Sequence, residues 1–251
     1  MHIKSIKKKG SEYLIILDDE TLKVNEEVLI NNNILYSKKL SNKDIKKIKE
    51  ETVYYENYSK ALKMINRKMR SEKEIRKSLK DISKEEIDKI IDKLKEINLL
   101  NNEVYAESYV NDKINLSLDG PYKIKKELEL NDIESEYIEK ALEKFTQDLI
   151  DEKLEKLINK KLKTNKDTEY IFKQKTALYL LNLGYSKEDI NSHLENIKID
   201  NSNLEKEMEK IYNKLKTKYE GYTLKNKLKQ KLYLKGFNND EINNFIEKTV
   251  H

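Results

Sequence analysis

Residues 58–100, YSKALKMINRKMRSEKEIRKSLKDISKEEIDKIIDKLKEINLL, decide the fold that we expect for this chain. Ser71 is followed three positions later by Glu74, and Ser83 and Glu86 repeat that spacing. This is a capping box, in which the Ser hydroxyl accepts from the backbone N–H three residues on and the Glu reaches back to the N–H of the Ser. Apolar residues at helical spacing surround both boxes. The stretch therefore predicts three short helices, each with one apolar stripe that its neighbours must bury.

The rest of the chain repeats this unit. Leucines recur at intervals of 52 residues (Leu128, Leu180, Leu232), as do isoleucines (Ile138, Ile190, Ile242). A fixed interval of this kind is typical of tandem repeats. Gly184 and Gly236 suit the left-handed conformation that ends a helix, as does the region of Asn131, and Pro121 after Gly120 suits the start of one. We therefore predict a mainly α protein of four tandem three-helix repeats that form an elongated, curved array.

The first residues of the chain have a different pattern. Within residues 1–30, short apolar segments alternate with turn residues, and Gly10 supplies the first turn. This predicts a small antiparallel sheet, covered by residues 26–30 or by the next helix. The predicted regions are a β-rich N-terminal region (1–40), a linking helix from the weak cap at Ser41 with repeat 1 (41–103), repeat 2 (104–146), repeat 3 (147–198) and repeat 4 (199–251).

Composition excludes several classes of protein. Five Gly and one Pro in 251 residues are too few for an all-β fold. The absence of Cys excludes disulfides and thiol chemistry. No run of 18 apolar residues occurs, and the first ten residues, MHIKSIKKKG, lack the apolar core of a signal peptide. We therefore expect a soluble protein of the cytoplasm.

Reactive groups do not converge in the sequence. The three His, at positions 2, 193 and 251, are scattered, and the dispersed Gly cannot form a phosphate-binding loop. Asp and Glu lie in runs mixed with Lys, where salt bridges in solvent explain them. We expect no enzymatic activity, no metal and no cofactor.

Charge is unevenly distributed although the net charge is only +5. Residues 60–80 hold nine basic and two acidic residues, residues 214–235 hold eight Lys and one Glu, and residues 101–150 have a net charge of −6. Of 51 basic residues only Arg67, Arg70 and Arg76 are Arg. Because Arg offers a planar, bidentate fork that Lys lacks, these three are candidates for contact with a partner. The alternative is that they form surface ion pairs with Glu72 and Glu74.

Basic residues of three repeats are the predicted contacts with a partner or with DNA. Tyr54, Tyr55 and Tyr58 lie near the first group and could stack on bases, but at helical spacing they are more often core residues. The predicted contacts are Arg67, Lys68, Arg70, Lys73, Arg76 and Lys77 in repeat 1, Lys123 and Lys126 in repeat 2, and Lys225, Lys227, Lys229 and Lys231 in repeat 4.

Three segments together resemble one known family. Ala61–Leu79 has the pattern A-L-x-x-I-x-R-x-x-R-S-x-x-E-I-x-x-x-L, Leu99–Ala106 is LLNNEVYA, and Gly120–Leu128 is GPYKIKKEL. In this order they resemble RecX, a family of regulators of the RecA recombinase. The β-rich extension and the fourth repeat resemble the longer form of Gram-positive bacteria. The family often has an acidic residue where this chain has Asn101 and Asn102, and Asn is also a suitable helix cap.

The resemblance implies a non-enzymatic modulator, mainly an inhibitor, of RecA. Such proteins bind the groove of the RecA–DNA filament and limit its growth, ATP hydrolysis, strand exchange and LexA cleavage, and so act in recombination, DNA repair and the SOS response. Among the matched positions, Arg67 and Arg70 are the implied contacts. We expect the RecA filament as partner, weak binding of single- or double-stranded DNA, no membrane, and a monomer.

Two alternatives of other classes stay open. A helical-repeat protein could bind DNA directly through residues 60–80 and 214–235, and its affinity would then fall steeply with salt. A purely structural helical scaffold would bind neither DNA nor RecA.

Overall fold

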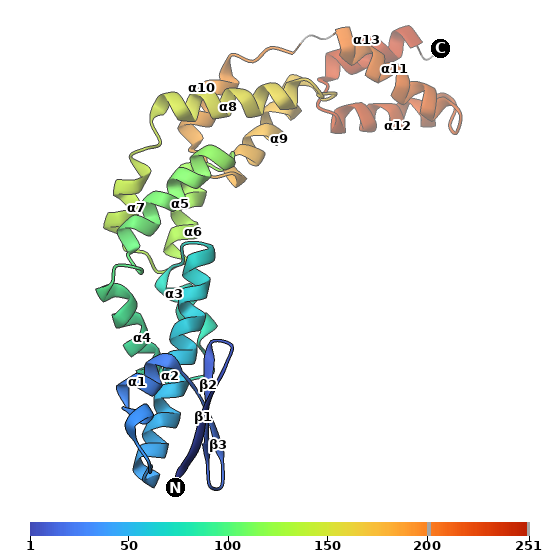
Figure 1. Cartoon of the computed structure of the whole chain (residues 1–251). Coiled ribbons are helices and arrows are strands. Elements are labelled where there is room, and N and C mark those ends of the chain that lie inside the picture. The colour runs from blue at the N-terminus through green and yellow to red at the C-terminus, as the bar shows by residue number, and fades with distance from the viewer. Residues whose placement is uncertain (200–201, 250–251) are drawn as a thin grey trace. The chain divides into compact units, whose positions relative to one another are not determined.

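A computed structural model describes residues 1–199 and 202–249 of the chain (Figure 1). The described residues form a three-stranded sheet followed by helices, which confirms the predicted class of a mainly α protein with a small N-terminal sheet. The chain divides into two compact units. The first comprises Met1–Ser108 and Leu128–Ile138, and the second Tyr109–Glu127 and Glu139–His251.

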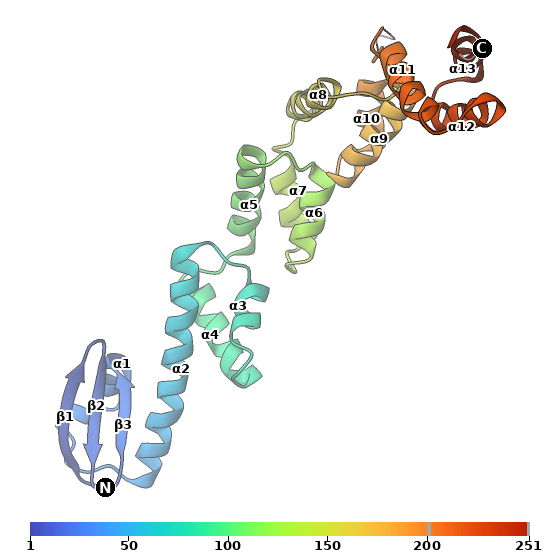
Figure 2. The ribbon, with the colours of Figure 1, turned by 90° about the vertical axis from the view of Figure 1, so that its right-hand side faces the viewer.

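The N-terminal sheet is antiparallel, with the strand order β1 (Ile3–Lys9), β2 (Glu12–Leu17) and β3 (Thr21–Asn25). Helix α1 (Glu26–Asn31) and the first half of α2 (Asn42–Arg67) cover one face of the sheet, as predicted (Figure 2). A short 3-10 helix, η1 (Ile34–Tyr36), connects these two helices. The core that they share is fully buried at Ile15, Val28, Ile34 and Ile48.

Repeat 1 consists of the second half of α2, α3 (Glu72–Ser78) and α4 (Lys84–Glu96), and each of these three helices begins at a capping box. Ser41 caps α2 together with Asp44, and the boxes predicted at Ser71 and Ser83 are both present. Side chains from the three helices meet in one core, whose fully buried members include Ala61, Ile75, Leu79, Ile90, Ile91 and Leu94. The local cap signals therefore predicted this repeat correctly.

The tyrosines of α2 are packing residues. Tyr54 and Tyr58 stack with 6.1 Å between ring centroids and lie against the core of repeat 1. Tyr55 lies against the core of the sheet region, and its hydroxyl accepts a hydrogen bond of 2.8 Å from Asn31. All three are half-buried, so the interpretation as core residues holds in place of base stacking.

Three further sets of three helices follow. Val104 N donates to Asn101 Oδ1 at 3.1 Å, so an Asn does cap the first of these helices. These three sets are named repeat 2, repeat 3 and repeat 4. The exact boundaries of the repeats in the sequence stay a prediction. Repeat 2 is α5 (Asn102–Leu116), α6 (Pro121–Glu129) and α7 (Ser135–Leu142); repeat 3 is α8 (Gln147–Leu162), α9 (Glu169–Asn182) and α10 (Lys187–Glu195); repeat 4 is α11 (Ser202–Lys216), α12 (Gly221–Leu234) and α13 (Asn239–Thr249).

Residues with positive φ follow the second helix of repeats 2 to 4. Gly184 and Gly236 adopt φ values of 89° and 84°, as predicted. After α6 the left-handed residue is Asp132, with φ 58°, one position beyond Asn131. Asp132 lies 52 residues before Gly184, so the interval of the repeat also holds for the backbone. Asp is among the few residues with a side chain that tolerate this conformation.

Within the second unit, the turn at Gly184 packs directly on the start of α6. Gly120 N donates to the carbonyl oxygen of Leu183 at 2.6 Å, and Tyr122 N donates to that of Gly184 at 3.0 Å. A Cβ on Gly120 would lie 2.5 Å from the Gly184 oxygen. Glycine is therefore needed at both positions for the two backbones to approach this closely.

Candidate functional site

Arg76, one of the three arginines, links α3 to α4. Its Nε lies 2.7 Å from Glu72 Oε1 on its own helix, and its Nη1 lies 2.6 Å from Asp88 Oδ1 on α4. The Nζ of Lys95, also on the α4 side, lies 2.7 Å from the second oxygen of Glu72. Four charged side chains thus form one network inside repeat 1.

The network changes the acidity of Glu72. Partial burial raises the pKa of this carboxyl, but hydrogen bonds from Lys95 and Arg76 lower it by more, so its pKa lies below the usual value. Burial lowers the pKa of Arg76, but its hydrogen bonds to Glu72 and Asp88 raise it by more. Arg76 therefore forms ion pairs that join α3 to α4. Its pair with Glu72 is the surface ion pair that the alternative interpretation predicts.

Arg70 and Arg67 differ from each other. Arg70 Nη1 pairs with Glu74 Oε1 at 2.8 Å, as the ion-pair interpretation predicts, while its buried Nε finds no hydrogen-bond partner among the described residues. Arg67 is exposed in the last turn of α2 and forms no ion pair with residues 1–199 or 202–249. Of the three arginines, Arg67 is therefore the one whose guanidinium can meet a partner without breaking an internal pair.

Of the lysines predicted as contacts in repeat 1, one forms an internal ion pair and two are exposed without one among the described residues. Lys73 Nζ lies 2.9 Å from Asp132 Oδ1, the left-handed residue after α6, and so joins two segments of the first unit. Lys68 and Lys77 are exposed, and neither has an ion pair within the described part of the chain. An exposed basic set, defined here as Arg67, Lys68 and Lys77, remains available for contact.

The lysines predicted in repeat 2 lie next to an ionic cluster of the second unit. Lys123 Nζ lies 2.6 Å from Asp119, whose other oxygen lies 2.9 Å from Lys113 Nζ. Burial raises the pKa of Asp119, but these two lysines lower it by more. The pKa of this carboxyl therefore lies below its usual value. Lys126 is exposed on the same helix. Lys123 is thus held by the fold, and Lys126 is open to solvent.

The four lysines predicted on α12 do not form one surface. Leu224, Leu228 and Leu232 occupy the buried face of this helix. Lys225 is half-buried, and the other three lysines are exposed. Only Lys231 faces the hollow that α12 forms with α11.

That hollow, which we name the lysine groove, collects lysines from three helices. It has a volume of about 650 Å³. The basic segment 214–235 contributes Lys214, Lys218, Lys231 and Lys235 to the groove, whereas Lys175 and Lys210 lie outside the segments singled out from the sequence. The groove is lined by Lys175, Lys210, Lys214, Lys218, Lys231 and Lys235, by the apolar Ile211, Leu215, Tyr219 and Leu234, and by Asp167 and Glu207.

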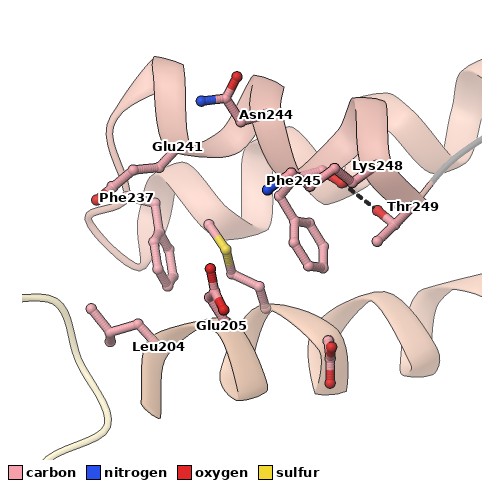
Figure 3. Close-up of a pocket in the computed structure, with 10 residues that line it drawn as sticks. Leu204, Glu205, Phe237, Glu241, Asn244, Phe245, Lys248 and Thr249 are labelled. Carbon is pink, nitrogen blue, oxygen red and sulfur yellow. Dashed lines mark hydrogen bonds between the residues drawn. The ribbon is translucent and has the colours of Figure 1, made fainter. Parts of the chain in front are cut away.

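A second hollow of repeat 4, about 430 Å³ in volume, lies between α11 and α13 (Figure 3). Its lining includes Leu204, Phe237 and Phe245 of the repeat's own core, and Glu205 and Glu241 among its polar residues. The hydroxyl of Thr249 donates to the carbonyl oxygen of Phe245 at 2.5 Å. Because Leu204, Phe237 and Phe245 belong to or pack against the core of repeat 4, the hollow lies against that core.

Residues 1–199 and 202–249 contain no group of three or more His, Cys, Asp or Glu side chains placed to hold a metal ion. None of the helices in that part of the chain is both long and apolar enough to cross a membrane.

Comparison with family models identifies three of the repeats. Residues 58–94 match the model described as RecX, first three-helix domain, and residues 101–142 match the second three-helix domain. Residues 199–246 match the third three-helix domain. The first, second and third domains of the family thus correspond to repeats 1, 2 and 4.

Curated relatives align with nearly the whole chain. The regulatory protein RecX of Streptococcus pyogenes serotype M4 is 32% identical and covers 97% of this chain and 97% of its own length. That of Listeria innocua serovar 6a is 30% identical over 96% of this chain and 94% of its own length. The protein of the same name from Oceanobacillus iheyensis is 28% identical over 99% and 97%.

Solved structures agree with this assignment. A crystal structure of regulatory protein RecX superposes with a TM-score of 0.65 at 30% identity, covering 78% of this chain and all of the other. RecX from Lactobacillus salivarius superposes with a TM-score of 0.50 at 32% identity, covering 58% of this chain and 98% of the other. The family models, the full-length relatives and the shared fold together place the chain in the RecX family of regulatory proteins.

Proposed function

We propose that this chain is a non-enzymatic modulator of RecA that binds the RecA–DNA filament and limits its activities. The observation that carries the proposal is the alignment over nearly the full length with proteins named regulatory protein RecX. The activities limited are those that the family resemblance implies: filament growth, ATP hydrolysis, strand exchange and LexA cleavage. The protein acts in the cytoplasm, as a monomer.

The charge of repeat 1 is consistent with a role in that contact. Arg67, Lys68 and Lys77 are exposed and have no ion pair within the described residues, so a partner's carboxylates or phosphates can reach them without competition. Such exposed charges mainly speed association and select the partner, and contribute less to affinity. Arg70 and Arg76 contribute indirectly, because their ion pairs hold the α2–α3 connection and the α3–α4 packing in place.

The test is RecA-catalysed ATP hydrolysis on single-stranded DNA, with the purified protein titrated in at a few molecules per hundred RecA. The titration is repeated with twice the DNA at constant RecA. A modulator of the filament lowers the rate at these low ratios, and its effect follows the ratio of the protein to RecA whichever DNA concentration is used.

Competition for DNA gives a different result. A protein that only masks the strand has no effect until it is abundant enough to coat the DNA, and doubling the DNA then relieves its inhibition. That outcome would overturn the proposed action on the filament and favour direct DNA binding as the function.

A further inference from the structure

We propose that the hollow between α11 and α13 of repeat 4, which we name the acidic hollow, is a docking site for a basic amphipathic helix of a partner protein (Figure 3). The apolar stripe of that helix lies on the floor of the hollow, and its Lys or Arg side chains pair with glutamates at the rim. The inference goes beyond the proposed action on RecA, because the helix is defined by its own chemistry and its binding requires neither RecA nor DNA.

The rim of the acidic hollow is negatively charged. Glu205 and Glu209 lie on α11, and Glu241 lies on α13. Lys248 is the one basic side chain among the described residues of the lining. This acidity is local, because residues 214–235 of the same repeat hold eight Lys and one Glu. A positively charged segment is therefore attracted to this hollow rather than to the rest of the repeat.

Two of the three carboxylates are open to a partner. Glu205 and Glu209 are exposed, and neither forms an ion pair with residues 1–199 or 202–249. Glu241 is half-buried, and its Oε2 accepts a hydrogen bond of 2.9 Å from the backbone N–H of Asn238, so it is partly engaged at the start of α13. The contact with basic side chains therefore depends mainly on the two glutamates of α11.

The elements around the hollow favour a helix over an extended segment. A bound strand obtains much of its affinity from the backbone of a sheet edge, but α11 and α13 use their backbone groups within the helices. A helix satisfies its own backbone and presents side chains alone. Its residues i and i+4 lie about 6 Å apart along the axis, and Glu205 and Glu209 have the same interval on α11.

The floor of the hollow is apolar and adaptable. Leu204 and Met208 of α11 line it, and in Figure 3 the rings of Phe237 and Phe245 point toward that helix. The flexible thioether of Met208 can adjust to apolar side chains of different shape. The volume of about 430 Å³ falls within the range of about 300–1,000 Å³ found for ligand pockets, so whole anchor side chains can enter. An apolar floor with an acidic rim complements an apolar stripe flanked by basic residues.

The experiment measures binding of a labelled helical peptide that carries a Leu stripe flanked by Lys. Fluorescence anisotropy follows binding to the full chain at low salt, without RecA or DNA. Glu205→Gln with Glu209→Gln removes two charges from the rim. The matched control, Glu220→Gln with Glu247→Gln, removes two charges from exposed positions of repeat 4 that do not line the hollow and have no ion pair among the described residues. Melting temperatures check that both variants stay folded.

For the rim variant we expect Kd to rise about fivefold or more, because two ion pairs with the peptide are lost. The control should bind within about twofold of the original chain, since its glutamates do not contact the peptide. An equal rise in both variants would overturn the proposal, because the peptide would then respond only to the net charge of the protein.

Two neighbouring asparagines of α13 localise the contact. Both are exposed, but Asn244 lines the hollow and Asn243 does not. Asn244→Lys places a positive charge at the rim and should weaken binding about threefold or more, whereas Asn243→Lys should leave it unchanged. The same affinity in both variants would contradict docking in the hollow.

A second peptide, in which Ala replaces every Leu, tests the apolar floor. It keeps the charge and the helix propensity, and it should bind at least about tenfold more weakly because less apolar area is buried. Equal affinity of the two peptides would overturn docking on the floor.

Sedimentation of the chain alone tests a second copy as the occupant. We expect a monomer at all concentrations. A dimer that forms with rising concentration and that the rim variant abolishes would mean that the hollow takes another copy of this chain, and would overturn the proposal of a separate partner.

Discussion

Lys153 Nζ on α8 lies 2.7 Å from the carbonyl oxygen of Ile114, in the last turn of α5. The same ammonium donates to the carbonyl oxygen of Ser117 at 2.8 Å. The final carbonyls of a helix have no partner within it, and a buried one must find a donor elsewhere. Lys153, only 6% exposed, is that donor, and its burial lowers its pKa.

Lys153→Met keeps the apolar stem and removes the donor. We expect the free energy of unfolding of the second unit to fall by about 2 kcal/mol, because two hydrogen bonds to a charged group are lost. Urea unfolding followed by circular dichroism measures this. Lys156→Met, at an exposed lysine of the same helix, is the control and should change stability by less than about 0.5 kcal/mol. Equal effects of the two substitutions would show that the hydrogen bonds of Lys153 contribute nothing.

Gly184→Ala should be strongly destabilising. Its φ of 89° disfavours any side chain, and a Cβ there would collide with the backbone of Lys123. We expect a loss of about 3 kcal/mol or more, as strain and displacement of the start of α6 add together.

Gly221→Ala separates these two causes. Gly221 also has a positive φ, of 51°, but a Cβ there would meet no atom within 4 Å. Strain alone then costs about 1 kcal/mol. Thermal unfolding of the two variants should therefore differ clearly, and similar melting temperatures would argue against close packing at Gly184.

Glu72→Gln should reduce the acid sensitivity of the first unit. Because the folded-state pKa of Glu72 is lowered, its contribution to stability is present above the unfolded-state value and is lost as pH falls through the folded-state value. The ion pairs are partly exposed, so the contribution is about 0.5 to 1 kcal/mol.

Melting temperatures between about pH 3 and pH 6 measure this. The original chain should lose more stability over this window than Glu72→Gln. The control Glu85→Gln changes an exposed carboxyl of α4 that has no ion pair among the described residues, and it should follow the original curve. A Glu72→Gln curve parallel to the original would contradict the assignment.

Arg67→Ala should weaken inhibition of RecA strand exchange severalfold without changing the melting temperature, because Arg67 is exposed and has no ion pair within the described residues. Lys43→Ala, an exposed position in the first turn of the same helix, is the matched control for loss of one charge. Full inhibition by Arg67→Ala would exclude this residue from the contact with RecA.

Arg76→Ala should behave differently from Arg67→Ala. It removes the pairs with Glu72 and Asp88, so we expect a lower melting temperature together with any loss of inhibition. Substituting all three arginines at once would lower both stability and partner contact. The single variants allow the effect on melting temperature to be measured separately from the effect on inhibition.

The helix starts could be predicted from the sequence because their chemistry is local. Ser71 and Glu74 complete a capping box within four residues, and no distant part of the fold has to be known. The family could be predicted for a similar reason, since its motifs are short and lie in a fixed order. For the end of α6 the sequence indicated only the region of Asn131, because Asn131 and Asp132 are both able to adopt a positive φ, and in the structure Asp132 adopts it.

The candidate contact surfaces were harder to predict, because they depend on how helices pack. The pair of Arg76 with Glu72 follows from a spacing of four residues, but its second partner, Asp88, lies on the next helix. The lysine groove requires the relative placement of α11 and α12, which the periodicity of either helix alone does not contain. The α12 lysines therefore looked equivalent in sequence, although only Lys231 faces the groove.

The hydrophobic cores also bear on how the chain is made. Three of them draw their buried residues from single continuous stretches, Ile15–Ile48, Ala61–Leu100 and Leu204–Ile246. The buried residues of the first two of these cores all lie before position 101 in the chain. During translation, the sheet region and then repeat 1 can fold while the remainder is still on the ribosome, which shortens the time for which their apolar faces are open to aggregation.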